Sequence, residues 1–93
     1  MSALERHEKR IRALGCMVCR RVHGVMTPAA LHHVAEGSGL RSPWAQVPLC
    51  AEHHQGGTGF HAGPKQFLGQ FRPPGDQEWG MLIWLIEDMA RAE

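Results

Sequence analysis

Apolar residues recur at helical spacing near the start of the chain. Leu4, Ile11 and Leu14 fall roughly on one face of residues 3–14, with arginine and glutamate residues between them. This is the pattern of an amphipathic helix. Gly15 stands where helices commonly end. We therefore expect a helix that stops just before the first cysteine.

A second and more apolar pattern occupies the end of the chain. Residues 76–91 predict a helix capped by Asp76, in which apolar residues recur every three or four positions. The residues of this stripe are Trp79, Leu82, Ile83, Ile86 and Met89. Further apolar residues lie outside it, so we expect a core helix packed on more than one side. A homodimer contact through this helix is the second interpretation.

Between these helices the pattern changes to short apolar runs separated by turn-forming residues. AALHHV (29–34) and AQVPLC (45–50) predict two short strands. AEHH (51–54) can open a helix, which the glycine-rich segment 55–59 interrupts. A Gly-Pro pair begins another helix over residues 63–71, with proline at its first position.

Composition limits the class of protein. Ninety-three residues make one small domain, and such domains often need a metal, disulfides or a partner chain for stability. No apolar run approaches the ~20 residues that cross a bilayer, and three cysteines fit poorly with a secreted disulfide framework. We expect one cytoplasmic α+β domain, residues 1–93, without membrane contact. It comprises a basic N-terminal helix (1–14), a core (15–71) and an apolar C-terminal helix (76–91).

The net charge of +1 conceals an asymmetry. Residues 1–72 hold nine Lys and Arg against four acidic residues, a balance of +5, whereas residues 73–93 have a balance of −4. The basic side chains are concentrated before residue 22. Such a cluster is compatible with a phosphate-binding face and equally with a solvated helix surface.

The cysteines follow a metal-ligand spacing. Cys16 and Cys19 are separated by two residues, and Cys50 and His53 repeat that gap after thirty intervening residues. Structural zinc is held by four nitrogen and sulfur ligands, often as two close pairs from separate segments. The pattern therefore predicts a Cys3His zinc site that ties a tight turn at the first pair to the second strand.

Other interpretations of the cysteines stay open. His54 or His23 can replace His53 as the fourth ligand. A thioredoxin-like redox pair is disfavoured, because it requires a helix that starts at the C-x-x-C, whereas here a helix ends before it. Three buried cysteines without a metal are the third interpretation.

Four further histidines suggest a second site. His32 and His33 are adjacent on a predicted strand, so their side chains point to opposite faces. Only one of them can turn toward the segment that carries His54 and His61. Three neutral imidazoles can hold a divalent cation with open positions, and a fourth imidazole nearby is suited to general-base chemistry.

The order of these motifs resembles the HNH (ββα-metal) nuclease superfamily. A longer match, from about Ala13 to Phe71, resembles the phage recombination enhancement function (Ref) proteins, which are RecA-dependent nucleases. It rests on the C-x-x-C, the His-His, the glycine-rich loop, PLC-x-x-HH and HAG-x-x-x-F. The resemblance implies a zinc-stapled HNH/His-Me finger core with flanking helices.

The resemblance also implies roles for individual residues. His33 corresponds to the general base, and His32, His54 and His61 correspond to ligands of a catalytic Mg²⁺, Mn²⁺ or Zn²⁺. The implied reaction is hydrolysis of a DNA phosphodiester in a bacterial or phage-infected cell, with a RecA-type recombinase filament as partner. The expected DNA-binding residues are Arg6, Lys9, Arg10, Arg12, Arg20, Arg21 and Lys65.

A non-catalytic alternative has sequence support. The chain contains no Asn, so the middle residue of the HNH name is missing, and its net charge is modest. The alternative is an inactive zinc-stapled module of the same fold that binds nucleic acid or protein. A third hypothesis is a zinc protein whose last helix mainly drives assembly.

Overall fold

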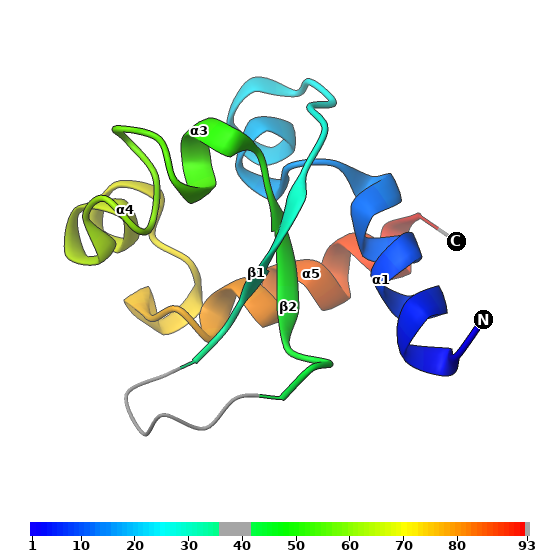
Figure 1. Ribbon diagram of the computed structural model, residues 1–93. Helices are drawn as coiled ribbons and strands as arrows, with labels where there is room; N and C mark the ends of the chain where they lie inside the picture. The colour runs from blue at the N-terminus through cyan, green and yellow to red at the C-terminus, as the bar shows by residue number, and fades with distance from the viewer. Residues whose placement is uncertain (36–41, 93) are drawn as a thin grey trace.

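The computed structural model describes residues 1–35 and 42–92 and is a small α+β fold (Figure 1). Helices surround one two-stranded sheet: α1 and α5 pack on the sheet and on each other, and α3 packs on the sheet as well. In this part of the chain, no helix is long and apolar enough to cross a membrane. The elements in order are α1 (Ala3–Leu14), η1 (Cys19–His23), β1 (Ala30–His33), β2 (Gln46–Leu49), α3 (Ala51–His54), α4 (Pro64–Phe71), η2 (Pro74–Asp76) and α5 (Gly80–Arg91).

The N-terminal helix is as predicted. Ser2 and Glu5 form a reciprocal capping box at the start of α1, which satisfies free backbone N–H groups of the first turn. Gly15 ends the helix at a φ of +76°. A side chain there would be strained, and its Cβ would lie 2.9 Å from the Met26 sulfur. The apolar face of α1 buries Ile11 in the core.

The two predicted strands form an antiparallel pair, in which Ala30 lies opposite Leu49 and His32 lies opposite Val47. Alternation along β1 buries His32 and exposes His33. All of β2 is buried, since α1 and α5 both cover it. Only one of the two tandem histidines therefore faces the interior, as the strand pattern requires.

The segment after the first cysteine is more helical than a tight turn. A π-helix, η1, follows directly at Cys19–His23 and ends at Gly24, which adopts a left-handed conformation. This extra turn places Arg20 and Arg21 against α5. The prediction missed it because the segment lacks a clear apolar period.

The last helix begins at Gly80, whereas the sequence predicted a start at Asp76. Gly75 and Asp76 both have positive φ values, 72° and 53°, so the backbone cannot continue as a right-handed helix there. Asp76 forms an exposed ion pair with Arg72 instead of capping α5. Gly80 lies so close to Pro74 that a Cβ would come 2.1 Å from its carbonyl oxygen.

The buried face of α5 also differs from the predicted stripe. Met81, Leu85 and Asp88 are buried, whereas Ile83 and Ile86 are exposed. A helix that is apolar all round has no unique face by hydrophobicity alone. Its rotation is set here by the buried carboxylate of Asp88, which pairs with the arginines of η1.

Candidate metal centres

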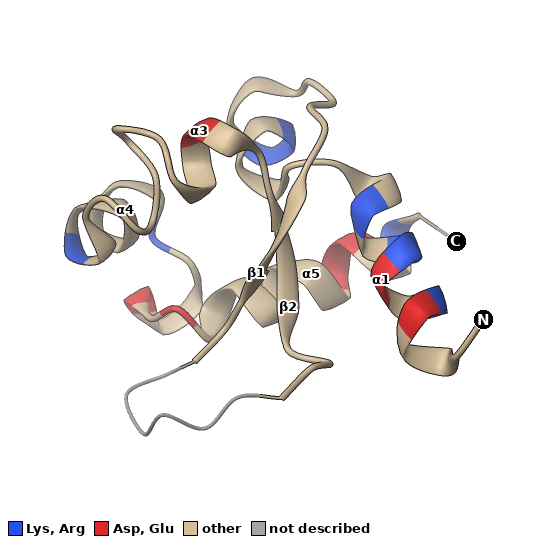
Figure 2. Cartoon of the chain, viewed as in Figure 1, with Lys and Arg blue, Asp and Glu red and all other residues tan. Residues whose placement is uncertain are grey.

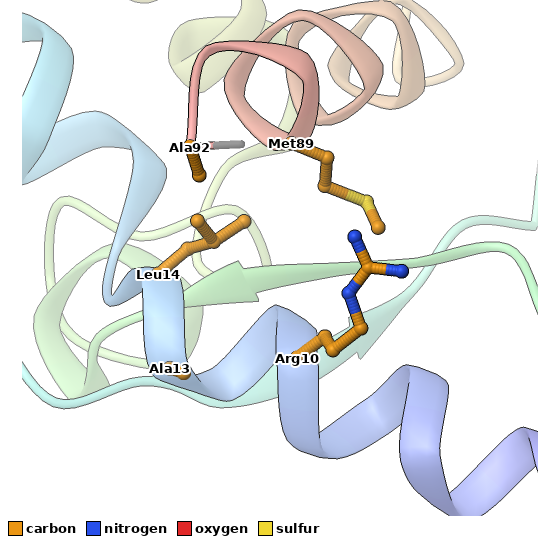
Figure 3. Close-up of a pocket in the computed structure, with 5 residues that line it drawn as sticks. All are labelled: Arg10, Ala13, Leu14, Met89 and Ala92. Carbon is orange, nitrogen blue, oxygen red and sulfur yellow. The ribbon is translucent and has the colours of Figure 1, made fainter.

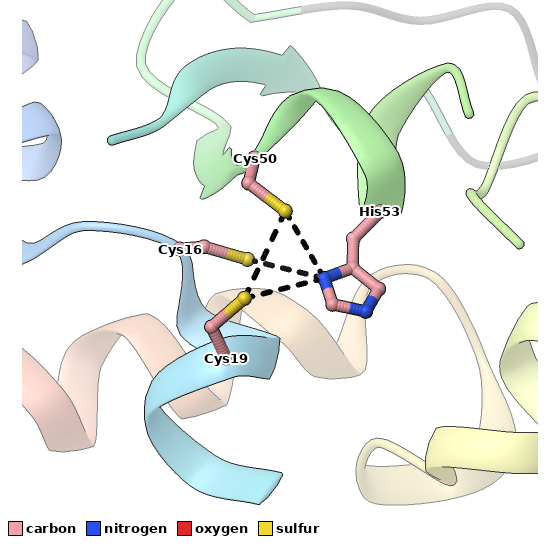
Figure 4. A group of neighbouring side chains, drawn as sticks. All are labelled: Cys16, Cys19, Cys50 and His53. Atoms are coloured by element: carbon pink, nitrogen blue, oxygen red, sulfur yellow. Dashed lines mark hydrogen bonds between the residues drawn. The ribbon is translucent and has the colours of Figure 1, made fainter. Parts of the chain in front are cut away.

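Cys16, Cys19, Cys50 and His53 converge in the interior (Figure 4). The first two come from the segment after α1, and the second two come from the start of α3. The Cys19 and Cys50 sulfurs are 3.8 Å apart. His53 Nδ1 lies 3.6 Å from the sulfurs of Cys16 and Cys19 and 3.2 Å from that of Cys50.

These separations fit a tetrahedral zinc ion. Zinc–sulfur bonds of about 2.3 Å and zinc–nitrogen bonds of about 2.0–2.1 Å place two sulfurs about 3.8 Å apart, and a sulfur and a nitrogen about 3.6 Å apart. Within the described residues, all three cysteines are free thiols rather than disulfide partners. The predicted ligand set is therefore brought together with suitable spacing, including His53 rather than His54 or His23 as the fourth member.

The surroundings of the thiols differ. Burial raises the pKa of the Cys16 thiol to about 11, against the effect of backbone hydrogen bonds from Cys19 and Cys50. For Cys50, burial acts in the same direction, but hydrogen bonds from the His53 backbone and the two other thiols outweigh it and lower its pKa. A buried cation would favour the thiolate form at all three positions.

His32, His54 and His61 form a second cluster. One ring nitrogen from each lies within 4.8 Å of the others, and the Nε2 atoms of His54 and His61 are 3.1 Å apart. His32 is only 2% exposed. Two imidazole nitrogens at this distance can bind the same cation. The three histidines expected as ligands therefore lie close together.

A break after α3 makes this approach possible, because positions 54 and 61 would lie about 10 Å apart along a continuous helix. The chain turns back so that the Phe60 N–H donates to the His53 carbonyl and the His61 N–H donates to the His54 carbonyl. Gly59 lies within this turn, where a Cβ would come 2.5 Å from the Glu52 carbonyl oxygen. The glycine-rich segment is therefore required by the cluster.

Two members of the histidine cluster, His32 and His54, have lowered pKa values. Burial lowers the pKa of His32, and a hydrogen bond to Glu78 opposes that shift. Burial also lowers the pKa of His54, with further repulsion from His61 and His33. Neutral imidazole is the form that binds a metal ion. His32 Nδ1 is buried and lacks a hydrogen-bond partner among the described residues, so a polar atom is left for a ligand.

Glu78 is a contributor that the sequence analysis missed. Its Oε2 lies 2.6 Å from His32 Nε2. Glu78 precedes α5 and is forty-six positions from His32, so no local spacing signals this contact.

His33 occupies the next position on β1 and is exposed. His33 is close enough to the cluster that electrostatic repulsion from it helps to lower the pKa of His54. It is therefore placed at the surface beside the clustered histidines, where a substrate can reach it.

The predicted DNA-binding residues divide into two groups. Arg20 and Arg21 pair with Asp88 on α5 at 2.5 and 2.9 Å, so they connect two elements of the fold. The others are exposed and lie on α1 or α4, where Figure 2 colours basic residues blue. Their role in DNA binding stays a prediction. This second group is Arg6, Lys9, Arg10, Arg12 and Lys65.

A pocket of about 310 Å³ lies where the ends of α1 and α5 meet (Figure 3). Its lining residues are Arg10, Ala13, Leu14, Met89 and Ala92. These side chains are mainly apolar and offer one cation, so the pocket lacks the groups needed for hydrolysis. The candidate chemistry lies with the histidines instead.

Together, the small α+β fold and its two ligand clusters define a candidate metalloprotein with one sulfur-rich and one imidazole-rich site. The family model described as "Recombination enhancement, RecA-dependent nuclease" matches residues 2–80. The chain belongs to this family, whose description implies nuclease activity and hence a nucleic-acid substrate. Neither the curated proteins nor the solved structures contain a match.

Proposed function

We propose that the chain is a divalent-metal-dependent DNA endonuclease of the HNH type that acts with a RecA-type recombinase. The family membership supports a nuclease. The single observation that carries the metal-dependent mechanism is the convergence of His32, His54 and His61. An exposed histidine, His33, adjoins this cluster on the same strand.

Three of the histidines would bind the divalent cation, and the fourth would accept a proton. His32, His54 and His61 would hold Mg²⁺, Mn²⁺ or Zn²⁺. A divalent ion bound there supplies positive charge that stabilises the phosphate oxygens and the leaving oxygen as charge develops on them.

In the reaction, His33 accepts a proton from the attacking water as the new bond from oxygen to phosphorus forms. The bond from phosphorus to the 3′ oxygen breaks, and that oxygen takes a proton from solvent. The products carry a 5′-phosphate and a 3′-hydroxyl. His33 is suited to this role because its ring is solvent-exposed and an imidazole exchanges protons near neutral pH.

The Cys3His cluster would have a structural role. A zinc ion there would clamp the segment that carries Cys16 to the start of α3, which carries His53. His54 is the next residue, so the same clamp would position one ligand of the second cluster. Because the binding free energy of such sites is folding free energy, the zinc would stabilise the whole fold.

DNA would be held mainly by the exposed basic residues of α1 and by Lys65. Exposed cations of this kind would neutralise phosphates, which gives sequence-independent and salt-dependent binding. Arg20 and Arg21 would contribute less, since both guanidinium groups pair with Asp88.

The test is cleavage of supercoiled plasmid in Mg²⁺, Mn²⁺ or Zn²⁺, with and without a recombinase filament on single-stranded DNA. Wild type should nick or cut, and His33→Ala should be slower by about 10²-fold or more. His7→Ala is the control, because His7 lies outside both clusters and contacts Trp44.

Two results would contradict the proposal in different ways. Wild type that cleaves under none of these conditions would favour the non-catalytic binding module. Cleavage at an undiminished rate by His33→Ala would remove the assigned base but leave a nuclease.

A further inference from the structure

A carboxylate behind the histidine cluster has no assigned role. We propose that Glu78 is a positioning residue, which holds His32 in the tautomer and orientation that leave Nδ1 free for the divalent cation. This inference rests on the proposed cation site of the histidine cluster.

Both oxygens of Glu78 are engaged. Oε2 lies 2.6 Å from His32 Nε2, and Oε1 accepts a hydrogen bond of 3.3 Å from the Ala35 backbone N–H. The His32 side chain is 2% exposed and the Glu78 side chain 13% exposed. The carboxylate therefore fixes the ring and the chain just beyond β1 at the same time.

This contact determines which nitrogen carries the proton. An ionised carboxylate can only accept hydrogen bonds, so His32 Nε2 must be the N–H donor. In the neutral ring, Nδ1 then carries the lone pair. That atom is buried and, within the described part of the chain, has no hydrogen-bond partner. A buried polar atom without a protein partner is unusual, and a bound ion is one way to satisfy it.

An ion pair between Glu78 and a protonated His32, with no cation bound, does not explain the unpartnered Nδ1 atom. A protonated His32 would place an N–H donor at Nδ1, which would be equally buried and without an acceptor. A cation at Nδ1 satisfies the atom, while the opposite nitrogen donates to Glu78. A carboxylate behind a metal-binding imidazole fixes the ring and raises its basicity, and losing it typically weakens metal binding.

Glu78 also connects the cluster to the rest of the fold. It lies between η2 and α5, and α5 packs on β2. The His32 imidazole on β1 is thereby held in place by a residue from the C-terminal part of the chain. Its partners His54 and His61 lie at the end of α3 and in the turn that follows.

The proposal is tested by calorimetric titration of Co²⁺ into protein that already carries one equivalent of zinc. Glu78→Gln preserves the shape of the side chain and removes its charge. We expect it to weaken the second ion about 10- to 100-fold, with the first zinc retained. Asp76→Asn is the matched control, since it removes one charge from the same segment at an exposed residue. It should bind both ions as wild type does.

A second measurement uses the wild-type protein, so it does not depend on the folding of a variant. Nitrogen-15 NMR of protein that carries only the structural zinc should show a proton on Nε2 of the His32 ring. Addition of Cd²⁺, a diamagnetic substitute for Co²⁺, should then shift the Nδ1 resonance. Protonation of Nδ1, or a metal shift at Nε2, would overturn the proposal.

The outcomes separate the two levels of inference. If Glu78→Gln binds the second ion within twofold of wild type, the role of Glu78 is wrong and the cation site stands. If wild type binds only one ion, both are wrong. If two ions bind and Glu78→Gln weakens one, but plasmid is never cleaved, the role of Glu78 stands and the nuclease proposal fails.

Discussion

Asp88 is the buried charge that fixes the last helix to the rest of the fold, and replacing it with asparagine should destabilise the protein. Its carboxylate accepts from Arg20 at 2.5 Å and from Arg21 at 2.9 Å, with Arg91 at 3.7 Å. Asparagine has similar volume but no charge. Its amide would also present N–H groups to one of the guanidinium groups, donor against donor.

The expected cost follows from burial. Removing one partner of a buried ion pair costs about 3–5 kcal/mol, because the other charge is left uncompensated. Here the Arg20 and Arg21 side chains are 29% and 24% exposed. Water can therefore solvate the guanidinium groups left unpaired, which reduces the cost. We therefore expect Asp88→Asn to lower the free energy of unfolding by about 2–3 kcal/mol. For a domain of this size, the melting temperature should fall by about 8–24 °C.

The assay is thermal unfolding followed by circular dichroism, with saturating zinc and neutral pH for every variant. Glu87→Gln is the matched control, since Glu87 also pairs with Arg21 but is 44% exposed. Its cost should stay below about 1 kcal/mol. If Asp88→Asn and Glu87→Gln melt at the same temperature, the argument from burial is refuted.

The remaining predictions concern the two candidate metal centres. Cys16→Ser, or removal of zinc by a chelator, should unfold the protein as judged by far-UV circular dichroism; a native spectrum without zinc would contradict the structural role of the site. Gly59→Ala should cost about 1–3 kcal/mol in denaturant unfolding, because its Cβ would meet the Glu52 carbonyl, and it should weaken Co²⁺ binding at the histidines. Gly57→Ala, which meets no atom within 4 Å, should do neither, and equal behaviour of the two variants would contradict this account of the turn.

Local signals predicted much of the fold and the residues that converge in the two candidate metal centres. The helix over residues 3–14 and the helix from Gly63-Pro64 to Phe71 follow their apolar period, cap and proline signals, and both are found. The convergence of the three cysteines with His53 was predictable because thiols are few and their spacing is short. The two strands were recognisable because turn-forming residues bound short apolar runs.

Features that depend on contacts distant in sequence were not predictable. The rotation of α5 is set by Asp88 and its arginine partners, while its apolar residues surround the helix and give no unique face. A signal was present, since the adjacent acidic residues Glu87 and Asp88 in an otherwise apolar helix can match the tandem Arg20-Arg21. Glu78 gave no such signal, because its contact with His32 exists only once β1 and the segment before α5 lie together.

The central claim is that one chain holds two different metal ions, one structural and one at the histidines. The most direct measurement is a crystal structure with anomalous scattering data after growth in Zn²⁺ and Mn²⁺. We predict one peak enclosed by Cys16, Cys19, Cys50 and His53, and a second peak in contact with Nδ1 of His32 and with His54 and His61. Unligated thiols, or no peak among the three histidines, would contradict the account.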